Sequence, residues 1–325
     1  MRLFMWHHMI SFTSGTGSDA QQPAPSLPML TRPPTTRNDV VAALGEFAGT
    51  FLFLFFAFAG TQIATTTSAT SPPRRDDILL PDVNNITFIA LAFGLSLMAN
   101  VWAFYRVTGG LFNPAVTLAL YLVGGLPVIR SIVVVVAQIV GGIAAAGVVS
   151  ALFPGPMGVE TTLGGGANVA QGLFIEMFLT AQLVFVIIMV AVEKHKSTYL
   201  APLAIGIAFF MAELVGVYFT GGSLNPARSL GPALVNGSFP GYFWIYWLGP
   251  ILGSLLASAF YTLLRWLHWE ECNPGQDWND VEKLESQKRN NVNVCSSGDT
   301  TPTNNSVTNG VGHKTTVMRT TQIEA

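Results

Sequence analysis

Two identical triplets place amide side chains at matching positions in an apolar chain. Asn113-Pro114-Ala115 recurs 112 residues later as Asn225-Pro226-Ala227, and Thr-Gly-Gly precedes both copies with the same spacing. An Asn side chain offers two N–H donors and one oxygen acceptor. Its oxygen can cap a helix while its N–H groups face a small polar molecule, so the chemistry indicated is recognition rather than bond making.

Three charged residues lie in the same apolar sequence. Arg228 follows Asn225-Pro226 on an apolar stretch, where a cation is costly and indicates a function, although an arginine that reaches to the surface is the alternative. Glu46 and Glu176 each begin an E-x-x-x-T motif, and we expect them, with Gln138, to accept hydrogen bonds from loop N–H groups. A catalytic carboxylate pair is the alternative, but no nucleophile or metal cluster accompanies it. We therefore expect no enzyme and no bound metal or cofactor.

An internal repeat has to position these residues. Residues 91–120 and 203–232 share ten identities at the 112-residue offset. The chain has 325 residues, of which 50% are hydrophobic and 10% are charged, with a mean hydropathy of +0.47, whereas a soluble domain carries roughly 25% charged residues. This composition indicates a membrane protein, and the net charge of −2 argues against a nucleic-acid partner.

Six segments have about the 20 apolar residues that a bilayer-spanning helix needs. They are 42–61, 86–105, 128–152, 170–192, 200–219 and 241–266. Two further apolar stretches, 114–122 and 226–235, are too short to span. Each begins with Pro after a capping Asn, so each predicts a half-helix that a re-entrant Thr-Gly-Gly loop carries into the membrane.

The expected fold is therefore an all-α membrane protein with six transmembrane helices and two re-entrant half-helices in inverted repeats, at about 42–152 and 170–266. The membrane domain covers 42–268, between tails at 1–41 and 269–325 whose polar composition predicts disorder. Both cysteines, Cys272 and Cys295, follow the last span, so no disulfide framework is expected. Basic residues in the connectors place both termini in the cytoplasm; these residues are Arg106, Arg130, Lys194, Lys196 and Arg265.

Residues 42–268 resemble the aquaporin, or major intrinsic protein, family. The resemblance rests on the two Asn-Pro-Ala triplets, Ala-Phe-Gly at 92–94, Ala-Gln at 137–138 and Asn-Pro-Ala-Arg-Ser at 225–229, and the tails look like those of fungal water-type members. It implies a homotetramer with a pore in each protomer, which passes water or, in some branches, glycerol or other small neutral solutes. It also implies that Asn113 and Asn225 face the pore, where the positive ends of both half-helices repel cations and protons.

The resemblance further implies a selectivity filter of Phe93, Glu213, Gly222 and Arg228. Phe93 precedes Asn113 by 20 residues, as the filter aromatic of water-type members does. Glu213 departs from the pattern, because those members carry a His twelve residues before the second Asn. A buried carboxylate needs a partner, so we expect an ion pair between Glu213 and Arg228. A Glu213 that turns away from the pore and bonds to loop backbone is the alternative.

The sequence thus predicts a passive water channel in a multi-pass membrane protein, most simply of the plasma membrane. Ser229, Ala233 and the Tyr246-Trp247 pair favour water over glycerol, because the family's glycerol-type members usually differ there. Because of Glu213, a facilitator of hydrogen peroxide, ammonia or, less favoured, glycerol is one alternative. A junctional or scaffold membrane protein that has the same fold and does not conduct is another.

Three surface residues carry weaker signals. Asn85 and Asn236 begin N-glycosylation sequons in connectors that we expect on the outer side. His195 lies in a basic cytoplasmic loop and is a candidate for a pH-sensitive gate, the alternative being an ordinary loop.

Overall fold

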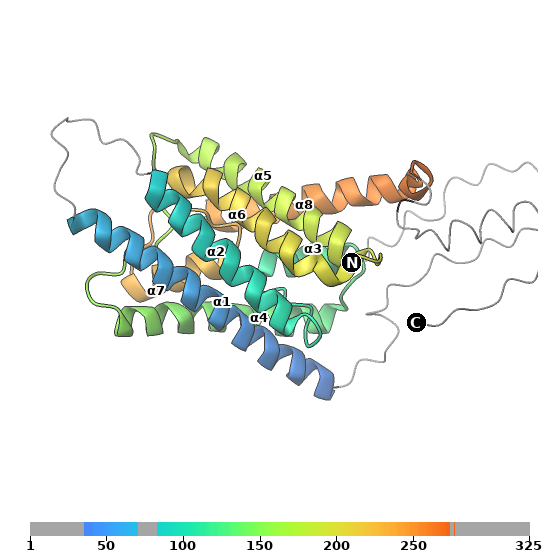
Figure 1. Cartoon of the computed structure of the whole chain (residues 1–325), viewed down its shortest axis with the longest axis horizontal. Coiled ribbons are helices and arrows are strands. Elements are labelled where there is room, and N and C mark those ends of the chain that lie inside the picture. The colour runs from blue at the N-terminus through green and yellow to red at the C-terminus, as the bar shows by residue number, and fades with distance from the viewer. Residues whose placement is uncertain (1–35, 71–82, 274–275, 277–325) are drawn as a thin grey trace, which may run out of the picture. The chain divides into compact units, whose positions relative to one another are not determined.

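The computed structural model describes residues 36–70, 83–273 and 276, which form helices and loops without a strand (Figure 1). The described residues up to Cys272 belong to one compact unit, and Asn273 and Gln276 belong to a second. Six helices of the first unit are long and apolar enough to cross a membrane. They are α1 (Thr36–Thr70), α2 (Val83–Phe104), α4 (Val128–Leu152), α5 (Val169–Ile187), α6 (Ala201–Thr220) and α8 (Ile245–Trp266).

Two short helices, α3 (Pro114–Leu122) and α7 (Pro226–Asn236), lie among the long ones (Figure 1). Helix α1 packs against α2 and α4, and α5 packs in the same way against α6 and α8, while α2 and α6 join the two halves. Helix α3 packs on α8 and α4, α7 packs on α4, and the two short helices contact each other. The predicted all-α membrane fold is confirmed.

Several helix ends differ from the prediction because a hydropathy pattern detects the apolar part of a helix and not its capped ends. Helix α1 begins at Thr36, six residues before the predicted start, and Asp39 in its first turn pairs with Arg130 of α4 at 2.9 Å. The predicted span 170–192 is divided between α5 and a π-helical turn, η3 (Ile188–Val192). Helix α8 starts four residues late, since residues 241–244 form a turn.

The predicted tails fall only partly within the described residues. Residues 36–41 of the predicted N-terminal tail are helical, and the 3-10 helix η5 (Trp269–Glu271) opens the predicted C-terminal tail. The rest of the N-terminal tail and nearly all of the C-terminal tail, with Cys295, lie outside the described residues.

Candidate functional site

The two re-entrant loops have the same unusual backbone. Gly110 and Gly222 have φ angles of +68° and +60°, and Phe112 and Leu224, two residues further on, have +51° and +49°. This left-handed region suits glycine, but it costs a residue with a side chain roughly 1–2 kcal/mol. Both loops therefore hold strain at equivalent positions, and contacts with neighbouring helices have to offset it.

Each loop ends at an Asn that caps the short helix after it. Asn113 Oδ1 accepts a hydrogen bond from the backbone N–H of Ala115 at 2.8 Å, and Asn225 Oδ1 accepts one from Ala227 at 2.9 Å. Both Asn residues are extended, and Pro114 and Pro226 fill the first helical position, where a missing N–H has no cost. The sequence therefore begins both half-helices at equivalent residues.

The two Asn side chains also fasten the loops to each other. Asn113 Nδ2 donates to the carbonyl oxygen of Leu224 at 2.8 Å, and Asn225 Nδ2 donates to that of Phe112 at 2.9 Å. The accepting carbonyl groups belong to Phe112 and Leu224, the two residues with a left-handed backbone. This backbone conformation directs each carbonyl oxygen toward the opposite loop. Each amide retains a second N–H for another acceptor. The sequence analysis did not predict these two crossed hydrogen bonds. The duplicated Asn-Pro-Ala triplet is the sequence feature that could have indicated them.

A buried carboxylate supports each loop from behind. Glu46 on α1 accepts hydrogen bonds from the backbone N–H groups of Leu111 and Phe112, at 3.1 and 2.8 Å. Glu176 on α5 accepts from Ser223 and Leu224, at 3.0 and 2.8 Å. Both glutamates are fully buried. These contacts are the ones that the predicted scaffold role requires.

Gln138 on α4 extends the support of the first loop. Its Nε2 donates to Glu46 at 2.9 Å and to the hydroxyl of Thr117 at 2.9 Å. Thr117 in turn donates to the backbone oxygen of Asn113 at 3.1 Å. The network links α1, α4 and α3 to the loop.

Arg228 ties the second loop together through backbone oxygens. Its Nε donates to Gly222 at 3.0 Å, and its two terminal nitrogens donate to Val159 at 2.7 Å and Gly221 at 3.1 Å. The side chain is 2% exposed, which excludes an arginine that reaches to the surface. Its guanidinium carbon lies 5.0 Å from the ring centre of Phe93, so the structure brings these two predicted filter residues together.

A second aromatic ring, which the sequence analysis did not identify, lies beside Arg228. Phe58 of α1 is buried, and its ring centre lies 5.5 Å from the guanidinium carbon. Such contacts favour a cation over the ring face. One of many phenylalanines in an apolar helix gives no sequence signal of this kind, so only the tertiary structure identifies it.

The predicted ion pair between Glu213 and Arg228 is wrong. No such pair forms in the described part of the chain, and neither carboxylate oxygen of Glu213 has a hydrogen-bond partner there. The alternative, a Glu213 bonded to loop backbone, is excluded by the same observation. The carboxyl group instead lies against Gly222, where a Cβ atom would overlap its Oε2 and lie 2.7 Å from Cδ. Arg228 directs three N–H donors to backbone oxygens and none to Glu213.

A small cavity adjoins both Asn side chains. Its volume is 10 Å³, close to the minimum that one water molecule needs. Its wall is otherwise apolar and includes Phe53 and Phe209, whose ring centres lie 5.8 Å apart. Phe209 also lies 5.9 Å from Phe93, the ring beside Arg228.

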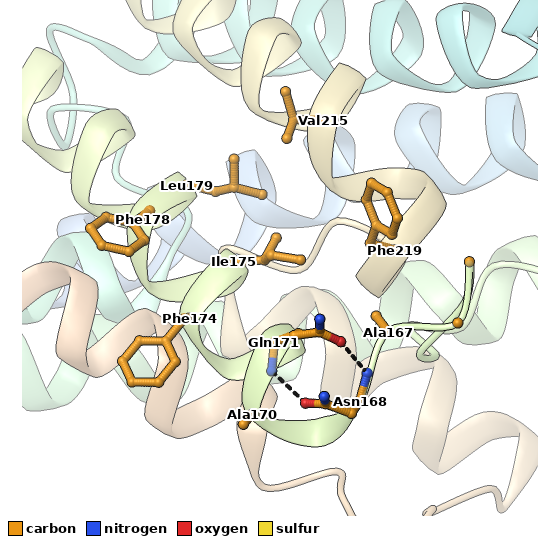
Figure 2. Close-up of a pocket in the computed structure, with 12 residues that line it drawn as sticks. Ala167, Asn168, Ala170, Gln171, Phe174, Ile175, Phe178, Leu179, Val215 and Phe219 are labelled. Carbon is orange, nitrogen blue, oxygen red and sulfur yellow. Dashed lines mark hydrogen bonds between the residues drawn. The ribbon is translucent and has the colours of Figure 1, made fainter.

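A wider groove of 720 Å³ lies between α5 and α6, on the outer face of the bundle (Figure 2). Phe174, Phe178 and Val215 line it, and each is more than half exposed. At one end Asn168 and Gln171 form a capping box that starts α5, with hydrogen bonds of 2.9 and 2.8 Å. None of the residues that line the groove belongs to an Asn-Pro-Ala triplet.

The three weaker sites lie away from the loops. Asn236 ends α7 and donates to Met157 O at 2.9 Å and to Glu160 Oε1 at 2.5 Å, while Asn85 lies in the first turn of α2. His195 lies between η3 and η4 (Thr198–Leu200), where its Nδ1 accepts from the N–H of Ser197 at 3.1 Å.

Comparison with known proteins gives a family for this arrangement. The family model described as "Major intrinsic protein" matches residues 35–261. The chain is 55% identical over 270 residues to "Aquaporin-7" of Botryotinia fuckeliana (strain B05.10), covering 81% of this chain and 59% of the relative. It is 52% identical over 239 residues to "Probable aquaporin-3" of Gibberella zeae, covering 73% of this chain and 82% of the relative.

A solved structure agrees in fold. The aquaglyceroporin from Plasmodium falciparum superposes with a TM-score of 0.56 at 23% identity, covering 67% of this chain and 95% of the other. The fold and the loops define a multi-pass integral membrane protein. More particularly, the chain belongs to the major intrinsic protein, or aquaporin, family, as the sequence resemblance predicted. It spans about half the length of two of the curated relatives that it matches, 59% and 45%.

Proposed function

We propose that this protein is a passive channel that conducts water and excludes ions and protons. The observation that carries the proposal is the crossed pair of Asn113 and Asn225 amides at the N-termini of α3 and α7. Two helix N-termini that meet at one point focus positive potential there. Neutral water accepts a hydrogen bond from the remaining amide N–H groups, whereas a cation or hydrated proton is repelled.

The second loop supplies the filter in this proposal. Arg228 keeps two of its five N–H donors after its three backbone contacts, and Phe93 and Phe58 bound the guanidinium. A fixed cation beside aromatic rings narrows the path and excludes cations. Glu46, Gln138 and Glu176 act as scaffold, because each accepts or transmits hydrogen bonds that hold the strained loops.

We place both termini in the cytoplasm and the protein most simply in the plasma membrane. The support is the distribution of basic residues over the connectors. In this orientation Asn85 and Asn236 lie on the outer side and His195 on the inner side, where glycosylation and gating remain predictions. The partners are water, small neutral solutes and membrane lipid, with no cofactor.

We also propose a homotetramer. The resemblance to the family supports it, and so does the exposed apolar groove between α5 and α6, which a neighbouring protomer would fill (Figure 2). Native mass spectrometry in detergent tests this. A tetramer is expected for the wild type, and Val215→Arg should release protomers, whereas a monomeric wild type would contradict the proposal.

A second candidate is a protein with this fold that does not conduct. The observation that favours it is the cavity of only 10 Å³ beside the two Asn side chains, bounded by Phe53 and Phe209. Stopped-flow shrinking of proteoliposomes separates the candidates. Water flux well above that of empty vesicles, with peroxide, ammonia and glycerol tested in parallel, supports a channel and defines its solutes. Flux equal to that of empty vesicles for every solute supports the non-conducting protein.

A further inference from the structure

Glu213 is a fully buried carboxyl group that the described residues leave without a hydrogen bond. Buried polar groups in folded proteins nearly always have a partner in the protein or in bound water. A carboxylate without one would cost several kcal/mol as an anion. The described residues therefore do not supply the hydrogen-bond partner of Glu213.

Hydrogen bonding distinguishes Glu213 from the two charged groups that act on it, Arg228 of α7 and Glu176 of α5. Arg228 already gives three donors to loop carbonyl oxygens, and Glu176 already accepts two backbone N–H groups. One guanidinium thus faces two carboxyl groups. Glu176 has two N–H donors that stabilise an anion, and Glu213 has none among the described residues, so hydrogen bonding favours the negative charge on Glu176.

The repeat shows why the protein provides no partner at this position. At the 112-residue offset, Glu213 and Gly222 correspond to Val101 and Gly110 of the first half. A Cβ on Gly110 would lie 3.0 Å from Val101 Cα and 3.3 Å from its Cγ1, so this pair packs as an apolar contact. In the second half the Glu213 carboxyl occupies the equivalent place against Gly222. The equivalent position in the first half holds an apolar side chain. A neutral carboxyl group suits such surroundings better than a carboxylate does.

We propose that Glu213 acts as a neutral carboxylic acid whose hydrogen-bonding partner is the permeating solute. The inference rests on the proposed channel function. A neutral carboxyl group has an O–H donor and a C=O acceptor on the two oxygens of one carbon. A small neutral solute with a donor and an acceptor on adjacent atoms, such as hydrogen peroxide, can bond to both at once. Glu213 is thereby a specificity-determining residue that favours peroxide relative to glycerol or ammonia.

Infrared spectroscopy of the purified full chain tests the protonation without requiring transport. The wild type at neutral pH should show a protonated-carboxyl C=O band that shifts in heavy water and is absent from Glu213→Gln. If the spectrum of Glu213→Gln lacks no protonated-carboxyl band that the wild type shows, the Glu213 carboxyl group is ionised and the proposal is overturned.

Permeability of proteoliposomes tests the role of the solute. Glu213→Gln keeps the size of the side chain and retains one hydrogen-bond donor group and one acceptor. It should therefore leave the ratio of peroxide to water permeability within about twofold of the wild-type ratio. Glu213→Leu removes both and should lower the ratio about tenfold, the usual scale of one unpaired hydrogen bond. If wild-type vesicles conduct and Glu213→Leu keeps the wild-type ratio, the specificity role fails and the channel function stands. If wild-type vesicles conduct nothing, both fail, and the infrared band still decides the protonation.

Discussion

The two re-entrant loops share one backbone and differ in the side chains around them. At the 112-residue offset, the second loop's surroundings hold Phe93, Glu213, Gly222 and Arg228, and the first loop's hold Ile205, Val101, Gly110 and Val116. The set around the first loop is entirely apolar, and three of its members line the 10 Å³ cavity. The set around the second contains a guanidinium and a carboxyl group. The repeat therefore fixes the backbone, while the side chains around one of the two loops set the proposed selectivity.

The loops also differ in how they are held. Glu46 accepts three hydrogen bonds, one of them from Gln138. The residue equivalent to Gln138 in the second half is Pro250, and Glu176 accepts two hydrogen bonds. Arg228 supplies the missing support by bonding to three backbone oxygens. Arg228 thus both supports the second loop and contributes to its proposed selectivity. We therefore expect equivalent substitutions in the two loops to have different effects.

The largest change in ion permeability is expected from a substitution at the Asn residues that both loops share. Asn225→Asp removes the donor to Phe112 O and places a carboxylate at the N-terminus of α7. It should admit cations, because the positive potential that excludes them would be neutralised. Whole-cell or planar-bilayer current checks this, with Asn225→Ala as a control for the lost hydrogen bond. A folded, membrane-inserted Asn225→Asp that passes no more cation or proton current than the wild type would show that this Asn does not set exclusion.

Arg228→Val gives the second loop the side chain of the first. Three buried or half-buried carbonyl oxygens would lose charge-assisted hydrogen bonds, so thermal unfolding in detergent should show a loss of about 3 kcal/mol of stability. Glycerol permeability should rise, since the filter loses its fixed cation. The matched control is Val116→Ala at the equivalent position, where a smaller buried side chain should cost about 1 kcal/mol and leave glycerol excluded. Equal effects of the two substitutions would remove the proposed distinction between the loops.

Gly222→Ala tests the contact that distinguishes Glu213 from Val101. The added Cβ would overlap a flexible carboxyl group, which can move toward the pore, so water permeability should fall several-fold. The positive φ adds roughly 1 kcal/mol of strain. Glu213→Ala should restore permeability in the Gly222→Ala background, because it removes the displaced group. In the first loop, Val101→Ala should not rescue Gly110→Ala, since the nearest atom there is the backbone Cα of Val101. Independent effects of Gly222→Ala and Glu213→Ala would refute this coupling.

The smallest effect is expected from mercury. Cys272, which is exposed, follows the last span, as Cys295 does in the sequence. Thiol chemistry therefore has no target in the proposed filter. Water permeability should stay within experimental error after mercuric chloride treatment, and Gly222→Cys should become sensitive. Strong block of the wild type that a reducing agent reverses would contradict this prediction.

Much of the fold followed from local signals in the sequence. Asn-Pro at 113–114 and 225–226 specified the start of both half-helices, because a capping side chain and a residue without N–H fit only that position. Apolar length specified the six spans, but not the start of α1, since polar residues from Thr36 continue the helix beyond the apolar run.

The candidate site was less predictable, because its contacts join distant segments. The crossed hydrogen bonds of Asn113 and Asn225 depend on two carbonyls in left-handed backbone, which no residue type signals. The ion pair expected for Glu213 is wrong, because Arg228 points its bonded donors at backbone oxygens of Val159, Gly221 and Gly222. Charge complementarity in a sequence does not reveal such backbone acceptors.

The most direct test of the central claim measures water and proton flux in the same proteoliposomes. Purified wild-type protein should accelerate osmotic shrinking well above empty vesicles, while an internal pH dye reports no added proton leak across an imposed pH gradient. Asn225→Asp in parallel vesicles should keep water flux and gain a leak. Wild-type vesicles that shrink no faster than empty ones, or that leak protons as fast as the Asn225→Asp vesicles, would contradict the proposal of a water channel guarded by two crossed Asn side chains.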